Sequence, residues 1–428
     1  MIYWAPFLHF YQPPTQFHAI LKKICKESYR PLLKVFSEHP QAKVTVNISG
    51  VLTETWNDHG AEDIIAGIAD LGRDGRLEFV DSAKYHPILP LIPEGEIRRQ
   101  IELNHKTNEY FYKKAYKPRG FFPPEMCYSN KVGGILADLG YEWVILSGVA
   151  CAASWPLDVI YKVNFAKNKL ATFFRDDIIS NKISFQNVDS QGFMAELIGL
   201  SKGREDIYVI TAMDAETFGH HIQNWEKLFL GELYETLEGG SPEYASIKHD
   251  VDLAKEHKDI LDSELIEKIQ VVTVSELLDK FSSKASLQPH SSSWSTSKDE
   301  IAGANFYPLW DNPLNPIHKL QWEHINICFE LVEAAIKLKG NKESQHFADV
   351  SRSLLDRAIH SCQFWWANKG KMWDINLVNM GLILQEEVLL NAYKAVSSSG
   401  CEEKIKKNNY RALVAARDIA YKIRDYLF

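Results

Sequence analysis

The sequence predicts an α/β fold in which a barrel-like sheet of about seven parallel strands precedes an α-helical bundle. Short apolar runs alternate with longer amphipathic stretches up to about residue 280. Helical spacing of apolar residues takes over after the Asn-Pro-Leu-Asn-Pro segment at residues 312–316. Polar side chains follow the ends of the apolar runs, where parallel β/α barrels carry their active sites. The fold class therefore already indicates where the chemistry should lie.

The apolar runs give the elements in order. Strands are predicted at residues 2–10, 43–48, 76–80, 118–122, 143–146, 207–211 and 269–274, with further short pieces at 172–175 and 183–185 in an insertion. One bundle helix should bury Trp322, Ile325, Cys328, Val332 and Ala335. A second should bury Phe347, Val350, Leu354, Ala358 and Cys362, and two more are predicted around residues 375–397 and 402–427. We expect a barrel at 1–285, a connecting loop at 286–319 that contributes to a substrate cleft, and a helical bundle at 320–428.

Composition narrows the class of partner. The formal net charge is −8 and no block of five or more Lys or Arg occurs. The sequence therefore lacks the clustered positive charge that binds nucleic acid or anionic lipid. Aromatic residues make up 12% of the chain, which provides many flat faces. Neutral partners are favoured, and the oligomeric state stays open.

The cysteines and the N-terminus bear on the compartment. Six cysteines lie far apart without a Cys-x-x-Cys pair, which predicts neither a disulfide framework nor a thiolate zinc site. The N-terminus lacks a basic leader, and no run of 18 apolar residues occurs. We expect a cytoplasmic protein that does not enter a membrane.

Glu125 is the first candidate catalytic residue. It follows an apolar strand and two prolines, which fix the backbone and remove two N–H donors. The carboxylate is therefore held on a rigid segment of backbone. A structural alternative stays open, in which Glu125 caps the next helix or pairs with an arginine.

A second acidic segment follows the strand at 207–211. Residues 214–221 hold Asp214, Glu216, His220 and His221. Placing several titratable side chains so close together costs free energy, so such a cluster is typical of a functional site. A nucleophile and an acid/base need two carboxyls from different strand ends facing one gap, and Glu125 and Asp214 fit that requirement.

The same residues could instead hold a metal. His9, His220, His221 and Asp214 are plausible nitrogen and oxygen ligands of the kind a metal-dependent deacetylase would use. Adjacent histidines on a strand point to opposite faces, however, so the spacing does not match a known zinc signature. We expect no metal and no cofactor, with the deacetylase interpretation kept as an alternative.

Five short segments stand in order along the chain. They are residues 9–13 (His-Phe-Tyr-Gln-Pro), 75–78 (Gly-Arg-Leu-Glu), 122–125 (Phe-Pro-Pro-Glu), 214–219 (Asp-Ala-Glu-Thr-Phe-Gly) and 361–366 (Ser-Cys-Gln-Phe-Trp-Trp). As a set they resemble glycoside hydrolase family 57, which includes α-amylase-like, 4-α-glucanotransferase and glycogen branching enzymes. The chain departs from the family pattern at Tyr11, where a second His is usual, at Phe122, where several subgroups carry Trp, and at Gln363, where an acidic residue is usual.

The resemblance implies an incomplete (β/α)7 TIM-like barrel followed by a helical bundle. It also implies a retaining mechanism on α-glucans, with Glu125 as nucleophile and Asp214 as general acid/base. An α-amylase-like glycoside hydrolase is the first choice, and a branching enzyme or 4-α-glucanotransferase the second.

Residues suited to sugar binding present donors, acceptors or flat faces. The candidates are His9, Gln12, Glu78, Phe122, Glu216, His220, His221, Trp294, Trp365 and Trp366. Of the two adjacent histidines we expect one at the site and one in the core. Besides the deacetylase, a non-catalytic carbohydrate-binding homologue stays open, although the presence of both carboxylates argues against it.

Overall fold

A computed structural model describes residues 1–165, 168–240, 263–283, 285–338, 340–370 and 372–427. Its contacts divide the chain into two compact units. The barrel unit comprises residues 1–12, 16–84 and 89–294, and the helical unit comprises residues 13–15, 85–88 and 295–428. Among the described residues no helix is both long and apolar enough to cross a membrane.

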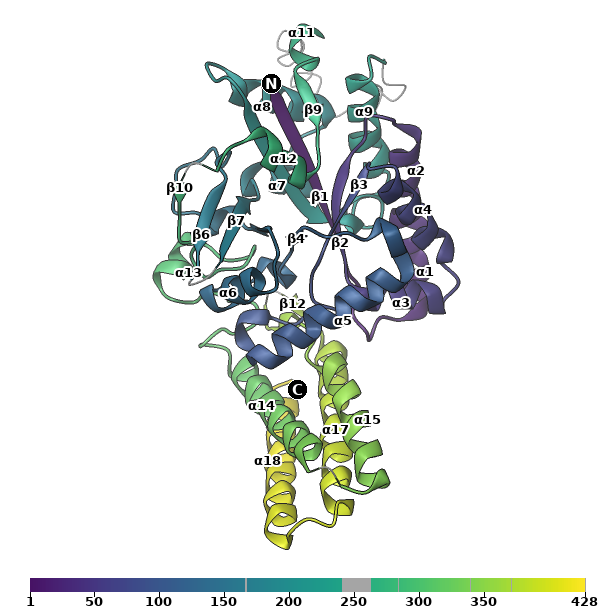
Figure 1. The fold of residues 1–428 in the computed structure, drawn as a ribbon, viewed down its shortest axis with the longest axis vertical. Coiled ribbons are helices and arrows are strands. Elements are labelled where there is room, and N and C mark those ends of the chain that lie inside the picture. Colours follow the sequence, from purple (N-terminus) through teal and green to yellow (C-terminus); the bar gives the residue numbers. More distant parts are fainter. Residues whose placement is uncertain (166–167, 241–262, 284, 339, 371, 428) are drawn as a thin grey trace. The chain divides into compact units, whose positions relative to one another are not determined.

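The strands of the barrel unit lie in two five-stranded sheets (Figure 1). They are β1 (Ile2–Phe10), β2 (Val44–Ile48), β3 (Leu77–Val80), β4 (Gly120–Phe121), β5 (Trp143–Leu146), β6 (Tyr161–Asn164), β7 (Lys169–Phe174), β8 (Ile207–Asp214), β9 (Ile269–Val271) and β10 (Ala285–Ser286). The first sheet runs β3-β2-β1-β8, with β9 also on β1, and the second runs β10-β6-β7-β5-β4. Every pairing is parallel except that of β6 with β7.

Short backbone contacts join the two sheets on both sides. Asp81 forms a parallel bridge with Phe121, which links the ends of β3 and β4. The main-chain N–H of Asp176 donates to the carbonyl of Ile210 at 2.8 Å, which links β7 to β8. The predicted incomplete parallel β/α barrel is confirmed.

β1 is the central strand, and a proline inside it is accommodated by a change of partner. Residues Ile2–Trp4 pair with β9, whereas Phe7–Phe10 pair with β2. Pro6 falls between these two partners, where its missing N–H costs no bond to either of them. On its other side β1 pairs with β8 continuously from Ile2 to His9, past Pro6.

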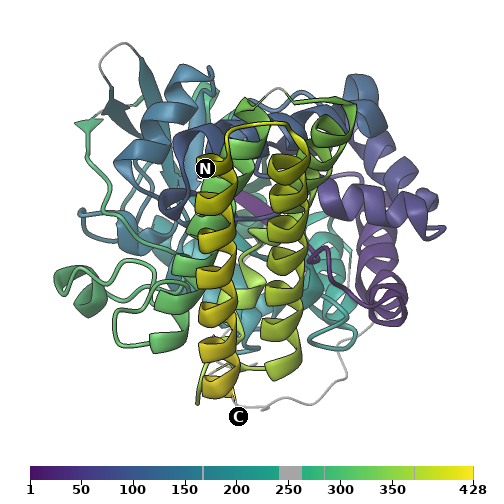
Figure 2. The ribbon, with the colours of Figure 1, turned by 90° about the horizontal axis from the view of Figure 1, so that it is seen from below.

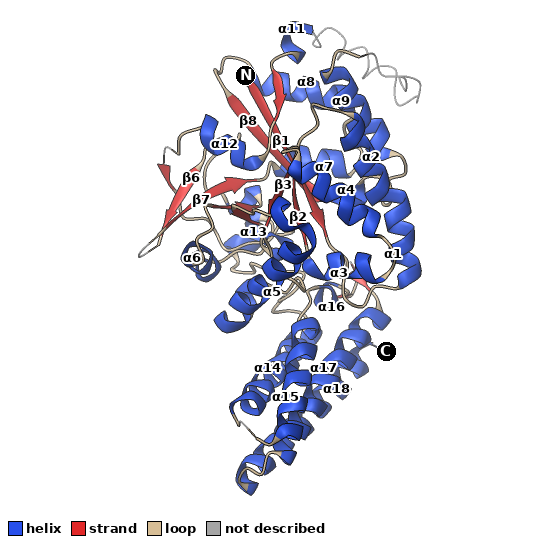
Figure 3. Cartoon of the chain, turned by 45° about the vertical axis from the view of Figure 1, so that its right-hand side comes forward, coloured by secondary structure: helices blue, strands red, loops and turns tan. Residues whose placement is uncertain are grey.

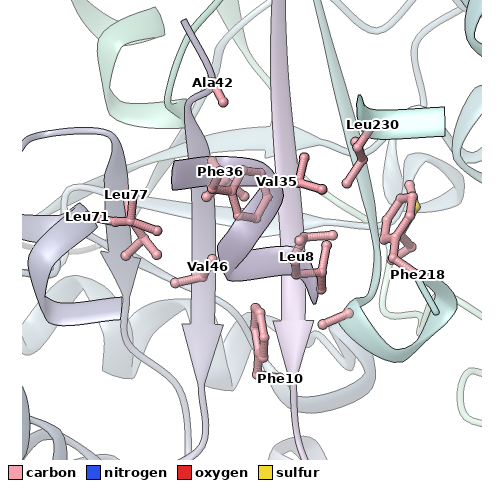
Figure 4. Packing of buried hydrophobic residues seen from close by; sticks show 14 of the residues in the cluster. Leu8, Phe10, Val35, Phe36, Ala42, Val46, Leu71, Leu77, Phe218 and Leu230 are labelled. Atoms are coloured by element: carbon pink, nitrogen blue, oxygen red, sulfur yellow. The ribbon is translucent and has the colours of Figure 1, made fainter. Parts of the chain in front are cut away.

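Helices of the barrel unit cover the outside of the strands (Figure 3). They are α1 (His18–Ile24), α2 (Arg30–Glu38), α3 (Gly50–Asp58), α4 (Glu62–Arg73), α5 (Glu94–Tyr112), α6 (Asn130–Asp138), α7 (Asp177–Ser184), α8 (Ser190–Ser201), α9 (Glu232–Leu237), α11 (Ser263–Ile266) and α12 (Val274–Lys280). Figure 4 shows Leu8, Phe10 and Val46 of the outer strand face packed with Val35 and Phe36 of α2. Odd-numbered residues of β1 therefore face inward, and His9 is one of them.

One predicted strand is wrong. Residues 183–185 belong to the end of helix α7, where Ile179 and Ile183 are buried one turn apart. Asp176 caps this helix by accepting a hydrogen bond from the N–H of Ile179 at 2.9 Å. The cap and the i, i+4 spacing select helix over the short strand that the apolar run indicated.

The helical unit contains four long helices. They are α14 (Pro316–Lys337), α15 (Lys342–Ala358), α17 (Ile375–Ser398) and α18 (Glu403–Leu427), with short α13 (Lys298–Ala302), α16 (Cys362–Trp365), β11 (Ala367–Asn368) and β12 (Met372–Trp373). Figure 2 shows α17 and α18 side by side. The stripe predicted for α14 is confirmed, since all five of its members are buried.

The stripe predicted for α15 is wrong at four of its five positions, since only Ala358 is fully buried. Ala348, Ser351 and Leu355 are buried, whereas Phe347 and Leu354 are only half-buried. Ser351 tolerates burial because its hydroxyl donates to the carbonyl of Ala348 at 2.8 Å. Apolar character alone therefore selected the wrong neighbouring positions.

Candidate active site

Glu125 stands on a strained turn directly after β4. It has φ 57° and ψ 19°, and Met126 also has a positive φ of 49°. Non-glycine residues rarely adopt this left-handed conformation, so the surrounding structure must hold it. Pro123 and Pro124 fix the approach, as the sequence predicted. The side chain remains half-exposed.

Trp294 bonds to Glu125 at two points. Its indole Nε1–H donates to Oε2 of Glu125 at 2.9 Å, and its main-chain N–H donates to the Glu125 carbonyl at 3.1 Å. A hydrogen bond to a carboxylate favours the ionised form. The sequence predicted Trp294 as a sugar contact, and the structure places it against the predicted nucleophile.

His9 ends β1 beside this pair. Its ring stacks on Phe122 with centroids 4.8 Å apart, and it meets the edge of Trp294 at 5.8 Å. Nδ1 lies 2.9 Å from Oδ1 of Asn47, the next strand's residue in register. Burial lowers the pKa of His9 to about 4, so the ring is neutral at neutral pH.

Asp214 ends β8 and lies opposite His9 in the parallel register of β1 and β8. Register partners in neighbouring strands point to the same face, so the two side chains share the inner face of the sheet. Burial raises the pKa of Asp214, and the positive charge of Arg175 partly opposes this rise. The carboxyl of Asp214 is therefore biased toward the protonated form.

Arg175 is a site residue that the sequence did not single out. It is buried at the end of β7, where its Nε donates to the carbonyl of Ala212 at 2.7 Å. Its other nitrogens bond to Asp177 and Asn181 at 2.8 Å each. The only sequence signal was an arginine at the end of the short strand at 172–175.

Glu216 lies in a buried polar network next to Asp214. Its Oε1 accepts hydrogen bonds from the hydroxyl of Tyr29 and from Nε2 of Gln12, the latter at 2.6 Å. Burial, followed by the charge of Asp214, raises the pKa of Glu216. Gln12 in turn accepts from Gln16 at 2.7 Å. Tyr29 comes from a helical turn and carried no signal in the sequence.

The two adjacent histidines have different surroundings. His220 is half-buried, and its Nδ1 lies 2.7 Å from the carboxylate of Glu27. His221 is exposed, and its main-chain N–H donates to the carbonyl of Glu216 at 2.8 Å.

Two predicted sugar contacts lie deeper than expected. Phe122 is fully buried between the rings of His9 and Phe7 and offers no free face. Glu78 lies two residues before the end of β3, and its Oε2 accepts from Thr45 at 3.0 Å and from the main-chain N–H of Ser275 at 3.1 Å. The structure therefore does not bring Glu78 to the edge that carries Glu125 and Asp214.

Trp365 and Trp366 belong to the helical unit. Both are half-buried, their ring centroids lie 5.2 Å apart, and Trp366 packs against a hydrophobic cluster that includes Val378 and Leu382. Their predicted contact with sugar stays a prediction.

The candidate metal ligands are not gathered. Within the described ranges, no group of three or more His, Cys, Asp or Glu side chains is arranged to hold a metal ion. His9 is bonded to an amide, and His220 is bonded to a single carboxylate.

His9 connects the two candidate catalytic carboxyls. Trp294, which holds Glu125, contacts the ring of His9, and Asp214 is in register with His9 on the next strand. One carboxyl has a hydrogen bond that favours the anion, while burial of the other favours the proton. This difference is what a nucleophile and an acid/base require. Glu125 and Asp214 therefore stay the candidate pair at the carboxyl edge of the parallel barrel.

The chain belongs to glycosyl hydrolase family 57, whose family model matches residues 8–287. An α-amylase of Pyrococcus horikoshii is 28% identical over 242 residues, which is 54% of this chain and 37% of that protein. The chain thus spans well under half the length of this curated relative.

Solved structures agree on the fold. A family 57 branching enzyme of Pyrococcus horikoshii aligns with a TM-score of 0.66 at 15% identity, covering 99% of this chain and 96% of the other. A 4-α-glucanotransferase of Thermococcus litoralis aligns with a TM-score of 0.67 at 18% identity, covering 92% of this chain and 59% of the other.

Proposed function

We propose that this protein is a retaining glycoside hydrolase that cleaves α-glucans through a glycosyl-enzyme intermediate. The proposal is carried by two carboxyls at strand ends: Glu125 accepts a hydrogen bond from Trp294, and Asp214, in register with His9, has a pKa raised by burial. Membership of family 57 supports the substrate class, because relatives are named α-amylase and 4-α-glucanotransferase.

In the proposed first half-reaction, a carboxylate oxygen of Glu125 attacks the anomeric carbon as Asp214 gives its proton to the glycosidic oxygen. The bond to the leaving sugar breaks, and a glycosyl ester forms on Glu125. Water then gives a proton to Asp214 and attacks the anomeric carbon, and the ester bond breaks.

His9, Gln12 and Glu216 are the residues that we propose to bind sugar hydroxyls nearest the carboxyls. The neutral ring of His9 has a donor and an acceptor nitrogen, one of which is committed to Asn47. His220, His221, Trp365 and Trp366 are proposed as further contacts with sugar.

Transglycosylation is the second candidate, because hydrolase and transferase share the first half-reaction. The structural neighbours include a branching enzyme and a 4-α-glucanotransferase. Products from maltooligosaccharides, amylose and glycogen separate the activities. Reducing-end release alone supports hydrolysis, whereas disproportionation or new branch points support transfer.

Glu125→Gln is the control for this assay, since the amide cannot form a glycosyl ester. The proposal requires that its activity fall by a factor of about 10³ or more with the melting temperature unchanged. If neither wild-type hydrolysis nor transfer is detected and glucan still binds, the protein is a carbohydrate-binding homologue.

We also propose a cytoplasmic location. None of the six cysteines, all of which the structure describes, forms a disulfide, and four of them are buried, as is expected of thiols in a reducing compartment.

A further inference from the structure

The two proposed catalytic carboxyls stand on different sheets of the barrel unit. Asp214 ends β8 in the first sheet, whereas Glu125 follows β4, which is the edge strand of the second sheet. The neighbouring edge is β3 of the first sheet, and an isolated parallel bridge between Asp81 and Phe121 joins the two edges. The placement of Glu125 relative to Asp214 therefore depends on this junction.

Hydrogen bonds hold the junction along three successive residues of the second sheet. The N–H of Asp81 donates to the carbonyl of Gly120 at 3.0 Å, and the N–H of Phe122 donates to the carbonyl of Asp81 at 2.9 Å. The hydroxyl of Ser82 then donates to the carbonyl of Phe122 at 2.7 Å. Two prolines separate Phe122 from Glu125, and their restricted φ angles carry the fixed direction of the chain to the carboxylate.

The side chain of Asp81 is fully buried and bonds to several elements at once. Its Oδ1 accepts from the N–H of Ser82 at 2.9 Å and from Nδ2 of Asn104 at 2.7 Å. Its Oδ2 accepts from the hydroxyl of Tyr141 at 2.7 Å and lies 2.8 Å from Nδ1 of His105. Asn104 and His105 belong to α5, and Tyr141 precedes β5, so one carboxylate ties both sheets to a helix. A buried network with its partners in place specifies one arrangement.

We propose that Asp81 and Ser82 are positioning residues that set where Glu125 stands relative to Asp214. This inference rests on the proposed function. Both side chains are fully buried, and their bonds reach Glu125 through the main chain of Phe122. A nucleophile must be held within bonding range of the anomeric carbon, and a misplacement of about 1 Å can cost about 100-fold in rate.

The first test removes one bond of the junction without adding bulk. Ser82→Ala lacks the hydroxyl that donates to the Phe122 carbonyl. On α-maltosyl fluoride we expect kcat and kcat/KM to fall together by about 10-fold, because attack is impaired while substrate binding is not. Asp81→Asn places an amide NH2 against groups that themselves donate, and it should cost about 100-fold.

Ser344→Ala is the matched control. The Ser344 hydroxyl is also buried and also donates at 2.7 Å to a main-chain carbonyl, that of Ala395 in the helical unit. Each alanine variant takes a hydroxyl donor from a carbonyl, so both should lower the melting temperature by similar amounts. Only Ser82→Ala should lower kcat. A purely structural role for Ser82 would not produce this difference.

A second test separates the nucleophile from the rest of the site. In Glu125→Gly, azide can attack the anomeric carbon of α-maltosyl fluoride from the vacated side. The carbon–fluorine bond breaks, fluoride leaves with the electron pair, and β-maltosyl azide forms. Glycine adopts the left-handed conformation of residue 125 readily. Adding Asp81→Asn to this variant should change the azide rate by less than about 3-fold, because the carboxylate that Asp81 positions is gone.

The inference is overturned if Ser82→Ala keeps the kcat of the wild type, or if Asp81→Asn slows the azide reaction as much as it slows the wild type. A wild-type protein inactive on both glucan and the fluoride, or an active Glu125→Gln variant, would instead sink the proposed function itself. Should Asp81→Asn not fold, Ser82→Ala takes its place in the azide reaction. Should azide not restore Glu125→Gly, the comparison with Ser344→Ala decides, and equal kcat in the two alanine variants overturns the inference.

Discussion

Asp214 and Glu125 both stand at strand ends and are partly shielded from solvent. The proposed acid step needs a proton on Asp214. Because burial raises its pKa, that proton is retained above the range of an ordinary aspartate. We therefore expect kcat/KM to fall as the pH rises through this raised pKa.

Variants of Arg175 test this fall in kcat/KM at high pH, which we call the alkaline limb of the pH profile. Its charge lowers the pKa of Asp214, so Arg175→Met should move the alkaline limb of kcat/KM to higher pH. Arg175→Lys keeps the charge and should move the limb less. An unchanged limb in the Met variant, measured where its melting curve shows a folded protein, would contradict this role for Asp214.

Buried His318 should make the stability of the helical unit depend on pH. Its Nδ1 accepts from the N–H of Asn312 at 3.1 Å, and its Nε2 lies 2.9 Å from the carbonyl of Phe364, which fixes the neutral form. Burial lowers its pKa from 6.5 to about 4. A lowered histidine pKa means that the unfolded chain takes up the proton first as the pH falls.

The contribution of His318 should therefore be fully present above about pH 6.5 and be lost toward pH 4, by ~3 kcal/mol. His318→Gln offers an acceptor and a donor without titrating. Urea unfolding of both proteins across this range should give a free-energy difference that changes with pH. A constant difference would refute the assignment.

At the scale of elements, Gly120 of β4 lies too close to Trp143 to carry a side chain. A Cβ on Gly120 would lie 2.1 to 2.4 Å from ring atoms of Trp143, which is fully buried. Gly120→Ala should therefore destabilise the protein by about 3 kcal/mol or more, because neither strand nor ring has room to move.

Gly199 is the matched control in α8. A Cβ there meets nothing within 4 Å, and the residue is exposed. Gly199→Ala should stabilise the protein by about 0.5–1 kcal/mol through helix propensity. Denaturation midpoints measure both variants, and equal midpoints would show that the space around β4 is not limiting.

The sequence predicted elements well where burial is continuous. β1 and β5 are buried along their whole length, so an apolar run marks them at nearly the right residues. It failed where a polar residue decides the structure, as with the Asp176 cap of α7 and the buried Ser351 of α15. Those outcomes depend on hydrogen bonds that apolar periodicity does not register.

The same limit applies to the site. Strand ends made His9, Glu125 and Asp214 candidates, because the fold class fixes which end of a strand carries chemistry. Tyr29 reaches Glu216 from 187 positions away, and the contact of Trp294 with Glu125 spans 169 positions. Only the folded chain brings such partners together.

For the whole molecule, the account requires no metal ion in catalysis, since the proposed displacement uses two carboxyls. Activity on amylose should survive prolonged dialysis against EDTA. Loss of activity that returns with zinc would favour the deacetylase alternative and require His9, His220 and His221 to be reinterpreted as ligands.

The central claim is that Glu125 forms a covalent glycosyl ester and Asp214 releases it. Asp214→Asn incubated with α-maltosyl fluoride tests this most directly, because fluoride leaves without an acid while ester breakdown loses its base. The account predicts a protein heavier by one maltosyl group, with the ester mapped by peptide mass spectrometry to Glu125. An ester on another carboxylate such as Glu216, or no ester although the wild type turns the fluoride over, would contradict it.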